Sequence, residues 1–93
     1  MSRQTGLPVT DASIASMSGI SQTLLAANPN REYIEIINSG SATVWVNLTG
    51  GTAAANTGIP ILSNGSWRGD VFVPSNAITV IGTAGQPLSC YWA

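Results

Sequence analysis

Short runs of alternating apolar and polar residues, separated by turn residues, follow one another along most of this chain. In the clearest run, 31–38, Ile34 and Ile36 share one face of a strand. Tyr33 and Glu35 share the opposite face. Strand-like runs also cover residues 18–26, 42–48, 66–73, 77–82 and 87–92. The short apolar run 59–62 contains Pro60, so it is expected to be at best an edge strand. No segment sustains the period of a helix, so the pattern predicts roughly six or seven short strands.

Turn residues separate these runs at intervals of roughly ten residues, which is typical of an antiparallel sandwich, a jelly roll or a small barrel. The spacing of runs 31–38 and 42–48 favours a hairpin between them. The pair Asn64-Gly65, ahead of the run 66–73, carries a hairpin signal of its own. We therefore expect an all-β fold, a small antiparallel β-sandwich or jelly-roll-like domain with an extended N-terminal arm.

The expected arm covers residues 1–17, which are rich in small and polar residues and show no clear period. Its spaced apolar residues suit contact with a neighbouring subunit, and residues 18–93 then form the sandwich domain. On this interpretation, a chain without the arm still folds. The alternatives are that the segment is a first strand of the sandwich or a frayed terminus.

Charged residues make up only 8 % of the 93 residues, against roughly 25 % in a typical globular protein. The chain has no histidine and no lysine, which excludes a histidine base, a lysine Schiff base and a phosphate-loop lysine. Three arginines are too few for a nucleic-acid surface. The single cysteine, Cys90, excludes an internal disulfide, and no ligand cluster suggests a metal. We expect no enzymatic activity, no cofactor and no metal.

A domain of this size buries only about 60–65 % of its unfolded surface, so it is marginally stable on its own. Without a disulfide or a metal, association with copies of itself or with a larger body remains as a source of stability. The low charge also leaves few groups to protect the strand edges. The alternative is a neutral extracellular β-protein. No apolar stretch is long enough to span a membrane, and residues 1–10 do not resemble a signal peptide.

Aromatic residues on the polar faces of strands are candidates for contact with a partner. Tyr33 and Trp45 are expected on neighbouring strands, where they either form a patch that stacks on sugar rings or anchor subunit contacts. Arg68 and Asp70 fall on one face of a strand and either grip a partner or form a surface ion pair. The full set expected at a partner interface is Leu7, Val9, Ile14, Met17, Tyr33, Trp45, Trp67, Arg68 and Asp70.

From Leu24 to the C-terminus, the chain resembles small structural proteins of tailed-bacteriophage particles. The similarity lies in the segments LLAANPNREYIEIIN (24–38), ATVWVN (42–47), GIPIL (58–62), VPSNAI (73–78) and IGTAGQPL (81–88). These motifs are structural, and the family supplies no catalytic residues to match. The resemblance implies a β-sandwich component of the virion, such as a head decoration (cement) protein or a small tail-associated module.

The leading hypothesis is a capsid decoration protein that bridges capsomers, forms a homotrimer and binds the major capsid protein. It would be made in the host cytoplasm without a signal peptide and lie on the particle surface, in contact with neither nucleic acid nor membrane. One alternative is a tail or fibre module that binds host glycans through the aromatic residues. Another is a head–tail joining or tail component, which would show ring symmetry.

Overall fold

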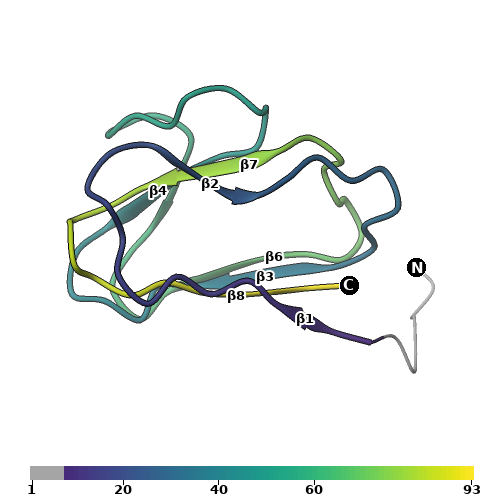
Figure 1. Cartoon of the computed structure of the whole chain (residues 1–93), viewed down its shortest axis with the longest axis horizontal. Coiled ribbons are helices and arrows are strands. Elements are labelled where there is room, and N and C mark those ends of the chain that lie inside the picture. The colour runs from purple at the N-terminus through teal and green to yellow at the C-terminus, as the bar shows by residue number, and fades with distance from the viewer. Residues whose placement is uncertain (1–7) are drawn as a thin grey trace.

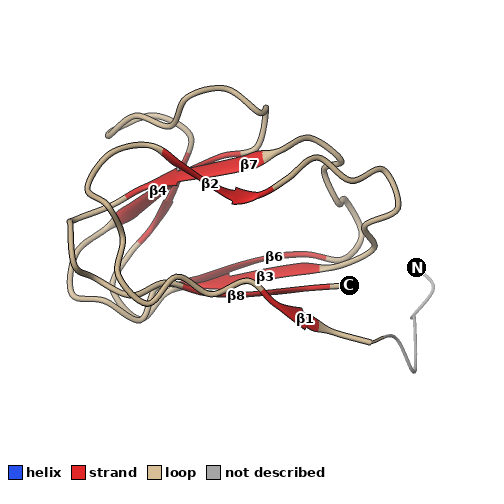
Figure 2. Cartoon of the chain, viewed as in Figure 1, coloured by secondary structure: helices blue, strands red, loops and turns tan. Residues whose placement is uncertain are grey.

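Eight strands within residues 8–93 form two antiparallel sheets that face each other as the layers of a β-sandwich (Figure 1). This computed structural model describes residues 8–93 and contains no helix in that range, hence none that could cross a membrane (Figure 2). The strands are β1 (Thr10–Asp11), β2 (Gln22–Leu25), β3 (Ile34–Ile37), β4 (Val44–Asn47), β5 (Ile59–Ile61), β6 (Ser66–Gly69), β7 (Ile78–Ile81) and β8 (Ser89–Trp92). The all-β fold expected from the alternating pattern is confirmed.

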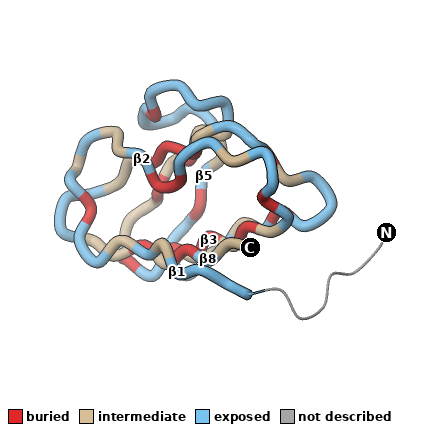
Figure 3. The backbone as a smooth tube through the Cα atoms, turned by 45° about the vertical axis from the view of Figure 1, so that its right-hand side comes forward, coloured by how far each residue is buried: buried red, intermediate tan, exposed pale blue. Residues whose placement is uncertain are grey.

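The order of strands is β1-β8-β3-β6 in the first sheet and β2-β7-β4-β5 in the second sheet. The core lies between them and is built from the alternate residues that the sequence places on one face of each run. Buried residues accordingly occur mainly in the strands, while the connections are mostly exposed (Figure 3). The largest fully buried apolar side chains are Ile34, Ile36, Val44, Val46, Ile78, Val80 and Leu88.

The chain changes sheet at almost every connection, and this corrects the expected hairpins. β3 and β4 belong to different sheets, so residues 38–43 cross the sandwich instead of forming a hairpin. Residues 62–65 likewise carry the chain from β5 to β6 in the opposite sheet, with Asn64 in the left-handed region at φ 64°. Turn residues specify that the chain reverses, but packing of the inner faces decides which sheet receives the next strand. Among consecutive strands, β4 and β5 pair with each other.

Residues 10–17, which belong to the expected arm, lie against the sandwich itself. β1 pairs with β8, and Ile14 forms a bridge with Leu88. Met17 is buried in the core, where its side chain lies close to Gly82. The backbone of Met17 is also held from both sides, by Gln86 and Gly85. This half of the segment thus has the role of a first strand, while residues 1–7 lie outside the described range.

Two buried polar side chains join the sheets, one at each end of β3. The Arg31 guanidinium donates to the carbonyls of Pro74 (2.7 Å) and Ala26, which lie on the approaches to strands of the second sheet. At the other end, the Asn38 amide donates to the carbonyls of Ala42 (2.7 Å) and Ile61 (2.8 Å). Both side chains donate to carbonyls that lie buried or partly buried at the junction of the two sheets.

Candidate interaction surfaces

A row of polar side chains crosses the outer face of the first sheet. The strand register places Glu35 of β3 between Arg68 of β6 and Tyr91 of β8. The register also places Tyr91 opposite Asp11 of β1. Tyr33, two residues before Glu35, belongs to the same face. We call these five residues the tyrosine face; they bring together charged side chains that lie far apart in the sequence.

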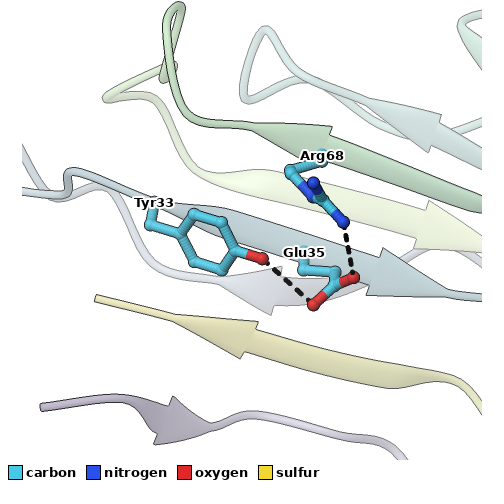
Figure 4. A network of polar contacts seen from close by, with 3 residues as sticks. All are labelled: Tyr33, Glu35 and Arg68. Carbon is cyan, nitrogen blue, oxygen red and sulfur yellow. Dashed lines mark hydrogen bonds and ion pairs between the residues drawn. The ribbon is translucent and has the colours of Figure 1, made fainter. Parts of the chain in front are cut away.

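Glu35 is the centre of the contacts on the tyrosine face (Figure 4). The Tyr33 hydroxyl donates to Glu35 Oε1 at 3.0 Å, and Arg68 Nη2 lies 3.5 Å from Glu35 Oε2. The expected partner of Arg68, Asp70, lies beyond the end of β6 at Gly69, so Arg68 pairs across the strands with Glu35 instead. Because the Arg68 side chain is 59 % exposed, this pair contributes about 0–1 kcal/mol.

Local hydrogen bonds set the proton affinities on this face. Partial burial raises the pKa of Tyr33, and its hydrogen bond to Glu35 raises it further, so the hydroxyl remains a donor. The hydroxyl and backbone N–H of Ser13 lower the pKa of Asp11. The backbone N–H of Ser13 donates to Asp11 Oδ1 at 2.8 Å. Near neutral pH the Tyr33 hydroxyl therefore stays uncharged, and the Asp11 carboxylate stays ionised.

Trp45 lies on the outer face of the second sheet, which corrects the expectation of one patch formed with Tyr33. It is half-buried and faces outward, because its neighbours Val44 and Val46 face the core. Across the strands, Trp45 lies opposite Pro60 and Ile81. The two aromatic residues thus lie on opposite outer faces of the sandwich and cannot stack on one ligand.

The long loop between β4 and β5, residues 48–58, folds onto the outer face of the second sheet. Thr79 Oγ1 donates to the Gly51 carbonyl at 2.6 Å, and the Ala53 N–H donates to Ser21 Oγ at 2.9 Å. Ala53 is buried. This loop therefore covers part of the sheet and is held at several points along its length.

Several residues expected at a partner interface contribute to the core instead. Met17 is buried, so in this structure it contacts the chain itself and not a partner. Ile14 and Trp67 are partly buried and pack against the core. Trp67 faces inward because it lies opposite Ile36 in the strand register. Val9 is exposed, and Leu7 lies outside the described residues.

The sequence prediction missed three exposed apolar residues that flank β6, one before the strand and two after it. Leu62 precedes the strand and is 65 % exposed, while Val71 and Phe72 follow it and are 72 % and 70 % exposed. The sequence prediction placed Val71 and Phe72 within the strand run 66–73. Gly69-Asp70 was the signal for an earlier end, because both residue types are depleted in strands.

Within residues 8–93, no group of three or more potential ligands could hold a metal ion. The Cys90 thiol is buried, and burial raises its pKa to about 11. A protonated, inaccessible thiol is a poor nucleophile. The described surface thus offers shape, aromatic rings and apolar side chains for binding.

No family model, curated protein or solved structure matches the chain. The fold, its surfaces and the sequence motifs are therefore the features that bear on function.

Proposed function

We propose that this chain is a non-enzymatic structural protein of a tailed-bacteriophage particle. Its role would be that of a capsid decoration protein that stabilises the head by bridging capsomers, with the major capsid protein as its partner. The observation that carries the proposal is apolar exposure on a chain with 8 % charged residues. The large side chains involved are Val9, Ile20, Leu62, Val71 and Phe72, each 59–72 % exposed.

Such a surface binds by removing apolar area from water, at about 25 cal/mol per Å² before the costs of association. Few ionic groups have to lose their hydration when it docks. A single copy would bind modestly, and repetition over a regular shell would add many such contacts. The segment resemblance to virion proteins supports the same role and a location on the particle surface.

Purified heads that lack the protein provide the test. Added protein should saturate a regular lattice of sites, at a copy number proportional to that of the major capsid protein. It should also raise the temperature at which the heads release DNA. Ile20→Asp should weaken binding, while Thr23→Asp, an exposed position with the same added charge, should not. Binding of only a few copies per particle would contradict decoration and favour a head–tail or tail component.

The tyrosine face supports one second candidate, recognition of a host glycan by a tail or fibre module. Tyr91 is 39 % exposed and lies beside Glu35, a combination of ring and acceptor that suits sugar binding. A glycan array would test it. A signal lost in Tyr91→Ala would support this function, and a silent array would remove it.

A further inference from the structure

Three of the four strands at the sheet edges are protected against pairing with another chain. β5 carries Pro60, which has no N–H to donate to a further strand. β2 is interrupted by an irregularity in register between Thr23 and Leu25. Prolines and bulges are common devices against edge-to-edge pairing. Neither edge of the second sheet therefore offers a continuous ladder.

At the β1 edge of the first sheet, the side chain of Asp11 occupies an outward N–H group that a further strand would need. The N–H groups of Ala12 and Ile14 donate to β8 and its approach, so the N–H of Ser13 between them points away from the sheet. That outward N–H is taken by the carboxylate of Asp11. An incoming strand would have to displace this bond and accept a charge at the edge.

β6 has none of these protections. The N–H of Asn38 donates to the Gly65 carbonyl, which fixes the alternation of the ladder between β3 and β6. It follows that Trp67 and Gly69 bond to β3, while Ser66 and Arg68 direct their N–H and carbonyl groups outward. The strand contains no proline, no lysine and no register irregularity.

The three exposed apolar residues flank this same strand. Leu62 lies before β6, and Val71 and Phe72 lie after it. Two antiparallel copies of β6 would bring the Leu62 end of one beside the Phe72 end of the other. The β6 edge and the residues that flank it in one copy would thus match the same edge and residues in a second copy, as a twofold interface requires.

We propose that β6 pairs antiparallel with β6 of a second copy of this chain, which joins two four-stranded sheets into one of eight strands. The outward groups fix the register. Ser66 lies opposite the partner's Arg68, and Trp67 lies on the twofold axis opposite the partner's Trp67. Moving the register by two residues in one direction would set Arg68 against the partner's Arg68, and repulsion between like charges disfavours that arrangement. Moving it by two residues in the other direction would set Ser66 against the partner's Ser66 and leave no other residue of β6 paired with the partner strand.

This twofold pair differs from the trimer expected from the sequence. A ring of three built by strand pairing would need a head-to-tail contact between different edges, and the other edges are protected. The inference concerns the free protein and goes beyond the proposed function, so it can hold or fail without the particle.

Sedimentation equilibrium over a dilution series tests the pair, with twice the 9.6 kDa chain mass expected at high concentration. The deciding comparison is Ser66→Glu against Ser66→Arg, two long charged side chains at one exposed position. Glutamate would face the partner's Arg68 and should tighten the dimer, whereas arginine should weaken it. Each change occurs at two symmetric pairs, so we expect shifts of about two- to thirtyfold in opposite directions.

Phe72→Asp should also weaken the dimer, and Ile20→Asp, an equally exposed apolar residue away from β6, serves as the matched control. Circular dichroism of each variant separates loss of pairing from loss of fold. The proposal is overturned by a monomer at the highest soluble concentration, by a trimer, or by a dimer whose affinity Ser66→Glu and Ser66→Arg change alike.

Discussion

At the scale of single residues, Cys90 shows how burial controls chemistry. It lies on the inner face of β8, opposite Ile36 in the register, and is fully buried. Burial raises the pKa of the thiol to about 11, although the positive charge of Arg31 acts in the opposite direction. The thiol therefore serves as a small apolar side chain of the core.

This raised pKa predicts a loss of stability in alkaline solution. The folded protein keeps the thiol proton where the unfolded chain, with an ordinary pKa near 9.0, has released it. The contribution of the protonated Cys90 thiol to the free energy of unfolding is fully present below that pH. It falls as the pH rises toward 11, by up to about 1.4 kcal/mol per pH unit. Urea unfolding across this range should show the decline in the natural chain and a shallower one in Cys90→Val.

Tyr33→Phe is the control, because the pKa of Tyr33 is also raised and its titration overlaps the upper part of the range. An unchanged slope in Cys90→Val would show that the thiol does not carry the effect.

At the scale of elements, the sequence predicts strands well and their partners poorly. β3, β4 and β7 lie within predicted runs because residues such as Ile34, Val46 and Val80 alternate with polar ones and reach the core. Alternation shows which face of a strand is buried. It does not show which of the two sheets the strand belongs to, because strands of both sheets bury one face in the same core. The choice of sheet after Asn38 or Asn64 depends on contacts between distant strands, which a local pattern cannot encode.

The same limit applies to the candidate surfaces. Tyr33 and Glu35 lie on the face opposite Ile34 and Ile36, as alternation alone predicts. Arg68 and Asp70 do not share a strand face, because β6 ends at Gly69. The joint patch of Tyr33 and Trp45 required knowing that their strands belong to one sheet, which they do not. The exposure of Phe72 depended on where β6 ends, and strand ends are set by the tertiary structure as much as by local propensity.

The position of residues 10–17 leads to a prediction at this scale. Removing residues 1–17 takes β1 away from β8 and Met17 out of the core, so the shortened chain should unfold at markedly lower urea concentration. Met17→Ala should cost about 2–4 kcal/mol, because it leaves a cavity beside Gly82. Val9→Ala, at an exposed position, should change stability by less than about 0.5 kcal/mol. Equal midpoints for the truncated and full chains would show that this segment is dispensable for folding.

At the scale of the whole molecule, Arg31 and Asn38 hold the two sheets together at opposite ends of β3. Arg31 donates to the carbonyl of Pro74, which precedes β7, and Asn38 donates to the carbonyl of Ile61 in β5. Both of these strands belong to the second sheet. Burial lowers the pKa of Arg31, yet a guanidinium remains charged, and its hydrogen bonds to carbonyls are stronger than neutral ones.

Arg31→Met and Asn38→Leu should therefore each destabilise the fold by about 2–4 kcal/mol, because the substitutions keep the volume and leave carbonyls without donors. Thermal or urea unfolding measures the loss. Arg68→Met, which removes an exposed guanidinium, should cost less than about 1 kcal/mol. If Arg31→Met costs no more than Arg68→Met, the hydrogen bonds of Arg31 do not contribute to holding the sheets together.

The place of β8 also determines when the protein can fold during synthesis. β8 is the last of the eight strands along the chain, but it lies inside the first sheet, between β1 and β3. Both neighbours leave the ribosome before the strand that joins them exists. Until then, the apolar faces of the early strands are open to aggregation, and pairings between such distant segments form slowly. β3 and β6 can pair earlier because they are direct neighbours, but β1 can join the first sheet only after β8 has been translated.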